Sequence, residues 1–179
     1  MKSIFAAFLL ALYAAGAPAA SGAPASPPRW SVHFSPRGGC TEAVVTELDH
    51  ARTSVFVQAY SFTSTPIAKA LVDAHRRGLR VEVVLDKSQR TEKYSSATFL
   101  FNNGIACSID AKHAIAHNKI ILIDGRTIIT GSFNFTKAAE ESNAENLLII
   151  EDKPDLYAAY DRNFGLHLAH AERYGGPVR

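Results

Sequence analysis

The sequence of 179 residues falls within the size range of a single domain. Its 19 lysine and arginine residues and 17 acidic residues give a formal net charge of +2, which excludes the strong basic excess of a protein that coats DNA. Any affinity for nucleic acid must therefore come from local clusters of positive charge.

The first 20 residues have the pattern of a secretory signal peptide. Lys2 is the charged start, 4–15 form an apolar stretch, and small residues at 17–19 and 23–25 both fit a cleavage site. We favour cleavage after residue 19 or 20, which leaves 21–29 as a flexible leader. The apolar stretch is short and rich in alanine, so no stable membrane insertion is expected, with an uncleaved anchor as the alternative. The protein is expected to be periplasmic or secreted.

The remaining residues, 30–179, are expected to form one domain in which strands and helices alternate. Short apolar runs predict strands at 30–34, 53–60, 79–85, 105–109, 117–123, 127–130 and 146–150. Apolar residues at helical spacing predict helices over about 40–51, 65–77 and 95–103 and from Pro154 onwards, with 86–95 as a polar loop. This order predicts an α/β fold with a mixed sheet flanked by helices on both faces.

The predicted strand at 117–123 begins the segment that carries the chemistry. Residues two apart on a strand face the same side, so His117 and Lys119 are expected to point together. Asp124-Gly125 is a strong signal for a two-residue hairpin turn. The chain then returns antiparallel, which brings Gly131 back beside His117.

His117, Lys119, Ser132 and Asn134 form a set of side chains that suits a phosphoryl group. Histidine can attack phosphorus or move a proton, while lysine and asparagine can hold the non-bridging oxygens. No metal-ligand cluster accompanies the set in the sequence. We therefore expect side chains to stabilise the negative charge on the phosphoryl oxygens, with no metal and no cofactor.

The spacing H-x-K-x4-D-x6-G-S-x-N, which starts at His117, resembles the signature of the phospholipase D superfamily. The runs 131–140 and 59–63 are similar to those of the small secreted bacterial endonucleases of that superfamily, and the similarity extends over essentially the whole mature chain. The resemblance implies a phospholipase D-like fold and cleavage of a phosphodiester bond through a phosphohistidine intermediate.

The motif occurs once, since of seven histidines only His117 is followed by a lysine two residues later. Larger members of the superfamily carry the motif twice, and the family reaction uses two such histidines, one as nucleophile and one as general acid. The resemblance therefore implies a two-fold homodimer with the active site at the interface.

The resemblance also assigns roles to the other residues of the motif. Lys119 and Asn134 would bind the phosphate, with help from Ser132 or its backbone. We interpret Gly131 and Asp124 as structural, because Asp124 lies an odd number of residues from His117 and sits at a turn.

Glu145, 11 residues after Asn134, is the better candidate for the carboxylate that orients the catalytic histidine. The family places an acidic residue at about this spacing, where it hydrogen-bonds the imidazole. A solvated surface glutamate is the alternative interpretation.

Basic residues near the ends of two predicted strands could bind a nucleic-acid backbone. Ligands of α/β proteins commonly lie at strand ends. Contacts between a protein and nucleic-acid phosphates do not depend on the base sequence. An ordinary solvated loop is the alternative. The candidates are Lys87, Arg90, Lys93 and Lys112.

The leading hypothesis is an exported, metal-independent endonuclease that cleaves DNA with little sequence preference. A phospholipid or cardiolipin hydrolase of the same superfamily, RNA as the main substrate, and a non-catalytic nucleic-acid-binding module are the alternatives. Export also permits a disulfide between Cys40 and Cys107, although both could equally remain buried thiols.

Overall fold

The computed structural model describes residues 29–176. The predicted signal peptide and all but the last residue of the predicted leader lie outside the described residues. Among the described helices, none is long and apolar enough to cross a membrane.

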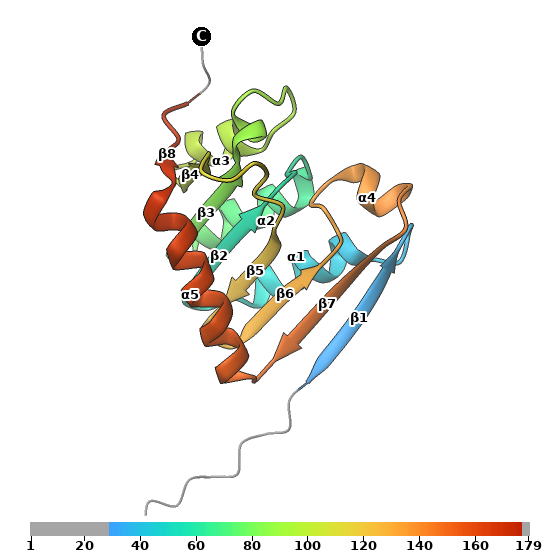
Figure 1. The fold of residues 1–179 in the computed structure, drawn as a ribbon. Coiled ribbons are helices and arrows are strands. Elements are labelled where there is room, and N and C mark those ends of the chain that lie inside the picture. Colours follow the sequence, from blue (N-terminus) through green and yellow to red (C-terminus); the bar gives the residue numbers. More distant parts are fainter. Residues whose placement is uncertain (1–28, 177–179) are drawn as a thin grey trace, which may run out of the picture.

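Eight strands form one mixed sheet in the order β1-β7-β6-β5-β2-β3-β4-β8 (Figure 1). Strands β2, β3 and β4 pair in parallel, whereas the other neighbours pair antiparallel. This arrangement confirms the predicted mixed sheet. The bounds are β1 Trp30–Ser35, β2 Ser54–Ala59, β3 Arg80–Asp86, β4 Ala106–Asp110, β5 Lys119–Ile123, β6 Thr127–Gly131, β7 Glu145–Glu151 and β8 Glu172–Arg173.

Helices cover both faces of the sheet, as predicted. Helices α1 and α2 lie behind it in Figure 1, and α5 crosses its front. The larger core fills the space under α1 and α2, and a smaller one joins β3, β5 and β6 to Tyr157 and Phe164 of α5. The bounds are α1 Cys40–His50, α2 Thr65–Arg76, α3 Ala97–Asn102, α4 Lys137–Glu141 and α5 Pro154–His170, with a 3-10 helix η1 at Lys87–Arg90.

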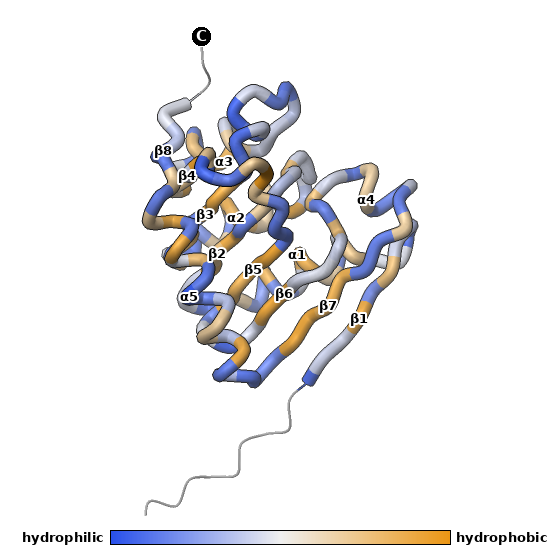
Figure 2. The backbone as a smooth tube through the Cα atoms, in the orientation of Figure 1, coloured by the Kyte–Doolittle hydropathy of each residue, from blue (hydrophilic) through white to orange (hydrophobic). Residues whose placement is uncertain are grey.

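The front of the sheet is uncovered where β7 and β1 lie beyond the reach of α5 (Figures 1 and 2). Trp30, Val32 and Phe34 of β1 share one face of this edge strand because successive side chains alternate. They are 70%, 41% and 62% exposed. We call these three residues the β1 strip. An exposed apolar row of this kind is typical of interaction surfaces.

The predicted strand at 117–123 is shorter in the structure, because β5 begins only at Lys119. The last pair of the β2–β5 ladder joins Ala59 to Lys119, so His117 has no strand partner and lies in the preceding loop. The hairpin turn is also longer than predicted. Three residues, 124–126, separate β5 from β6 rather than two.

Short elements escaped the prediction, namely η1, α4 and β8, since each is too short to carry a periodic apolar pattern. The two cysteines are free and buried. Burial raises the pKa of the Cys107 thiol to about 12, and burial together with the charge of Glu140 raises that of Cys40 to about 11. Both are inert thiols of the core.

Candidate active site

The predicted site residues meet in one open cleft of about 350 Å³ at the ends of neighbouring strands of the sheet. The cleft lies where β5 begins, β6 ends and β7 begins. The hairpin and the β6–β7 pairing thus bring together side chains that are up to 28 positions apart in the sequence. The lining residues are His117, Lys119, Gly131, Ser132, Asn134 and Glu145.

Gly131 lets β6 approach β7 closely at the floor of the cleft. It has a φ of +145°, and a Cβ atom built there would lie 2.2 Å from the backbone oxygen of Asn146. A side chain would therefore force the two strands apart. This contact agrees with a structural role for the glycine.

The segment after Gly131 alternates between the core and the cleft. Phe133 and Phe135 are fully buried, whereas Ser132 and Asn134 between them line the cleft. The Ser132 hydroxyl accepts a hydrogen bond from the backbone N–H of Asn146 at 3.1 Å. Among the described residues, no group pairs with the buried Oδ1 atom of Asn134. That oxygen can only accept, so the amide NH₂ is the part of this side chain that can donate to an anion in the cleft that Asn134 lines.

His117 is exposed at the mouth of the cleft and packs against Tyr60, with ring centroids 4.6 Å apart. The Lys119 ammonium lies 5.2 Å from the same tyrosine ring and donates to the backbone oxygen of His117 at 2.7 Å. Tyr60 therefore contacts both the His117 ring and the Lys119 ammonium. It lies in the run 59–63 that carried the family resemblance, but the sequence assigned it no role.

Lys119 is buried. Burial lowers the pKa of its ammonium, whereas the charge of Glu145 raises it by a smaller amount. A buried lysine is costly without a partner, and here the backbone oxygen of His117 and the nearby charge of Glu145 offset that cost. Glu145 lines the cleft, but the side-chain hydrogen bond it makes within the described residues comes from Asn143 at 3.2 Å. The expected hydrogen bond to His117 is therefore not formed in this structure.

Asp124 lies at the opposite end of the hairpin from the cleft. Its carboxylate accepts from the backbone N–H groups of Arg52, Thr53 and Ser54 at 2.8–3.0 Å. Burial would raise the pKa of Asp124, but these hydrogen bonds outweigh it and the pKa lies below its usual value. Its φ of +54° also places it in the left-handed region of a turn. These contacts are structural, and they tie the turn to the start of β2.

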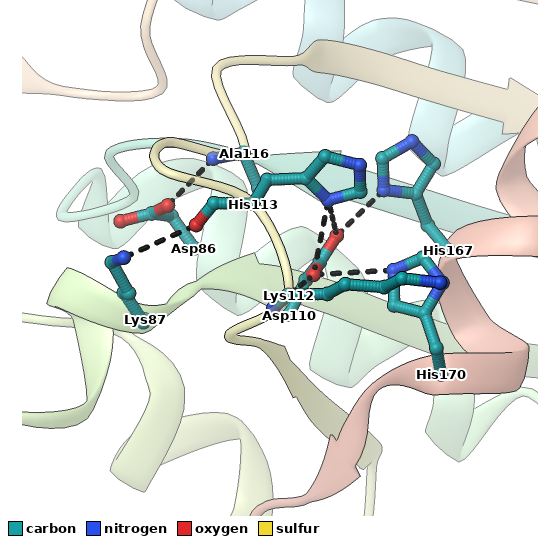
Figure 3. A network of polar contacts seen from close by, with 8 residues as sticks. All are labelled: Asp86, Lys87, Asp110, Lys112, His113, Ala116, His167 and His170. Carbon is teal, nitrogen blue, oxygen red and sulfur yellow. Dashed lines mark hydrogen bonds and ion pairs between the residues drawn. The ribbon is translucent and has the colours of Figure 1, made fainter.

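The four basic residues proposed for substrate binding do not form one patch. Lys87 donates to the backbone oxygen of His113 at 3.1 Å, which places it against the loop that carries Lys112 and His117 (Figure 3). Arg90 instead pairs with Glu172 at 2.8 Å, and the Lys93 ammonium lies over Tyr94. Lys87 and Lys112 are therefore the two that the fold associates with the His117 loop.

Asp86 connects this loop to the sheet. One carboxylate oxygen accepts from the N–H of Ala116, next to His117, at 2.7 Å, and the other accepts from Ser88 at 2.9 Å. Burial would raise the pKa of Asp86, but these hydrogen bonds hold it below its usual value. Asp86 was not among the residues predicted from the sequence. Its position at the end of a predicted strand was the available signal.

A separate polar cluster, drawn together with the Asp86 contacts in Figure 3, is centred on Asp110 at the end of β4. Three histidines contact its fully buried carboxylate, one from the following loop and two from α5. Burial would raise the pKa of Asp110, but the hydrogen bonds from the histidines, that of His167 foremost, hold it at about 2. This cluster was not predicted from the sequence, although Asp110-x-x-His113 and His167-x-x-His170 stand there as spaced pairs.

Comparison with known proteins places this cleft in a family. The family model described as "Cardiolipin synthase, PLD-like domain" matches residues 44–168. Phospholipase D of Rickettsia felis is 42% identical over 134 residues, or 75% of this chain and 66% of that protein. Mitochondrial cardiolipin hydrolase of Xenopus laevis is 33% identical over 121 residues, or 68% and 57%. The chain thus spans slightly less than two thirds of the Rickettsia relative.

The fold has a close counterpart among solved structures. The crystal structure of Nuc from Salmonella typhimurium, a phospholipase D family member, matches with a TM-score of 0.80 and 37% sequence identity over 83% of this chain and 99% of that one. Because the family model covers more than half of the residues and contains the whole cleft, this chain belongs to the phospholipase D superfamily.

Proposed function

We propose that the protein is a phosphodiesterase that cleaves DNA with little sequence preference and without a catalytic metal ion. The observation that carries this proposal is the cleft in which an exposed imidazole, a buried ammonium and the carboxamide of Asn134 converge from three segments. Such a site offers a nucleophile and donors for a phosphate. Recognition of the phosphate alone would leave the base sequence unread.

In the proposed reaction, a ring nitrogen of His117 attacks phosphorus and displaces the sugar oxygen, which forms a phosphohistidine. A second imidazole gives its proton to the departing oxygen. That imidazole then takes a proton from water, whose oxygen attacks phosphorus and releases the histidine. Lys119 and the carboxamide of Asn134 hold the non-bridging oxygens, where negative charge must be stabilised throughout. Tyr60 keeps the imidazole and the ammonium in place.

The second imidazole is proposed to be His117 of another copy in a two-fold homodimer. The described cleft contains one histidine, and the chain carries the motif once. The β1 strip supports this assembly, because it leads along the β1–β7 ladder to Ser35, which pairs with Glu145 at the cleft. Two copies that bury their β1 strips against each other would bring their cleft edges together.

We further propose that the protein acts outside the cytoplasm, in the periplasm or the medium. This rests on the signal-peptide pattern of residues 1–20 alone. Fractionation of the producing cells and N-terminal sequencing of the exported form would test it. A full-length chain that remains in the cytoplasm would contradict it.

The activity is tested with supercoiled plasmid in excess EDTA at 25 °C. Wild-type protein is expected to nick the plasmid, and the His117→Ala variant is expected to be inactive. His50→Ala, which changes an exposed histidine at the end of α1, serves as the matched control and should retain activity. Release of phosphatidate from cardiolipin vesicles with no cleavage of DNA would overturn the choice of substrate in favour of lipid.

The assembly is tested by sedimentation of a Val32→Asp, Phe34→Asp double variant. We expect it to be monomeric and to lose nuclease activity while its circular dichroism spectrum remains native. Phe99→Asp, which alters a similarly exposed apolar residue on α3, should remain dimeric and active. A monomeric wild-type protein with full activity would contradict the shared site.

A further inference from the structure

The cluster around Asp110 presents four ligand atoms to one point. A carboxylate oxygen of Asp110 and one ring nitrogen each of His113, His167 and His170 all lie within 4.8 Å of one another. The three histidine nitrogens lie 3.1, 2.6 and 3.2 Å from the carboxylate oxygens, so each ring turns a nitrogen towards the same centre (Figure 3).

This ligand set matches the coordination chemistry of a first-row transition metal. Imidazole nitrogen and carboxylate oxygen are ordinary zinc ligands, and four protein ligands make a closed tetrahedral site. Neighbouring ligands of such a shell lie roughly 3.3 Å apart when the bonds to zinc are about 2.0–2.1 Å long. The contacts of His113 and His170 with Asp110, at 3.1 and 3.2 Å, are already close to this spacing, whereas the 2.6 Å contact of His167 must lengthen. The widest pair, at up to 4.8 Å, must contract.

The cluster has one residue that is free to make this contraction. Asp110 is fully buried and the side chains of His167 and His170 are 13% and 23% exposed, so their positions are set by packing. His113 is 44% exposed and lies on a loop, where its ring can rotate towards an ion.

The cluster is incompletely satisfied without an ion. The Nε2 atom of His170 is buried and forms no hydrogen bond with any described residue, although it lies 3.2 Å from Asp110. Its close polar neighbour is the carboxylate of Asp110, and a buried polar atom that is poorly hydrogen-bonded carries an energetic cost. An ion bound to Nε2 would reduce that cost.

Supporting contacts orient the ligands from outside the cluster. The backbone N–H of Lys112 donates to Asp110 at 3.1 Å, and the Lys87 ammonium holds the backbone oxygen of His113 at 3.1 Å. Metal sites in proteins depend on such outer hydrogen bonds to fix the rotation of their ligands.

We propose that Asp110, His113, His167 and His170 bind one Zn²⁺ ion as a structural site separate from the catalytic cleft. The ion would join three parts of the chain: the end of β4, the loop that leads to His117, and the last turn of α5. Because all four positions of the shell come from the protein, the ion takes no direct part in phosphodiester cleavage.

The test uses ZnCl₂ as the probe and protein stripped of metal with a chelator. Competition with a chromogenic zinc chelator is expected to show one tight site per chain in the wild type and in His117→Ala. A His167→Gln, His170→Gln double variant should bind at least 100-fold more weakly. His50→Gln is the matched control and should bind as the wild type does. Binding that survives the double substitution, or no binding to the wild type at micromolar zinc, would overturn the proposal.

Two measurements keep the test independent of misfolding and of nuclease activity. X-ray absorption of the zinc-loaded wild type is expected to show nitrogen and oxygen ligands with imidazole scattering at about 2.0–2.1 Å and no sulfur. Saturating zinc should raise the Tm of the wild type by roughly 5–10 °C, but not that of the double variant. A sulfur-containing shell, or an equal Tm shift in both proteins, would contradict the site. Neither outcome depends on whether the protein cleaves DNA.

Discussion

The cleft around His117 and the cluster around Asp110 use similar side chains in opposite ways. In the cleft, the imidazole is exposed, packs on an aromatic ring, and has no carboxylate hydrogen-bonded to it among the described residues. In the cluster, each of three imidazoles contacts one fully buried carboxylate. The first arrangement leaves ring nitrogens available to a substrate. The second commits them to an internal partner.

The comparison shows that histidine by itself does not identify a catalytic site. What distinguishes the two regions is the rest of the chemistry nearby. The cleft adds a buried ammonium and a carboxamide, whose N–H groups can donate to a phosphate. The cluster adds only a carboxylate, which suits a cation.

The largest expected effect is on nuclease activity, which should depend on the cleft and not on the cluster. His117→Ala should lower the rate of plasmid nicking by at least ~10³-fold, because it removes the proposed nucleophile and acid together. His167→Gln should leave the rate per folded molecule close to that of the wild type at 25 °C. Equal losses in the two variants would erase the distinction between cleft and cluster.

The next effect concerns the phosphate-binding groups. Lys119→Met and Asn134→Ala are each expected to lower kcat/KM by ~10²–10³-fold, since each removes one donor that stabilises charge in the transition state. Steady-state kinetics on a bis(nitrophenyl) phosphate ester would measure this without a contribution from DNA binding. An unchanged kcat/KM for either variant would remove that residue from the site.

A smaller effect, on stability, is expected at Asp124. Asp124→Asn should reduce the free energy of unfolding by about 2 kcal/mol, because a charged acceptor of several hydrogen bonds is lost. The rate per folded molecule should change little. Urea denaturation together with active-site-normalised rates would measure both. A stable but inactive variant would show that Asp124 acts in catalysis.

The same residue predicts a dependence on pH. The folded-state pKa of Asp124 lies below its unfolded value of about 3.9. Its contribution to stability is therefore fully present above that value and disappears as the pH falls through the folded pKa. The stability difference between the wild type and Asp124→Asn should accordingly shrink in acid.

The smallest expected effect concerns Glu145, the carboxylate that lines the cleft. The charge of Glu145 opposes the lowering of the Lys119 pKa by burial, so Glu145→Gln should lower that pKa further. The alkaline limb of the pH–rate profile is then expected to move to lower pH. A shift of the acidic limb instead would show that Glu145 acts through His117, as the family resemblance implies.

Most of the fold was predictable because its long elements carry strong periodic patterns. The apolar run at Ile120–Ile123 and the helical spacing within α2 are examples, and both lie within one or two residues of their predicted bounds. The errors fall where tertiary contacts decide. Strand β5 begins at Lys119 because β2 ends opposite it, and no local pattern reveals where a neighbouring strand stops.

The candidate site was predictable in its members, but not in its contacts. The spaced motif identified His117, Lys119 and Asn134, and the structure brings them into one cleft. Tyr60 and Asp86 went unassigned, because they lie far away in the sequence and approach only when β2 and β3 enter the sheet.

The sequence alone determined which residues can perform phosphoryl chemistry, since residue type and motif spacing are local properties. Only the tertiary structure decided that Asp110 gathers His113, His167 and His170 around it. Those side chains are up to 60 positions apart, and their meeting depends on α5 packing its last turn against the end of β4. Long-range packing sets which groups share a point in space, and a single-sequence pattern carries no record of it.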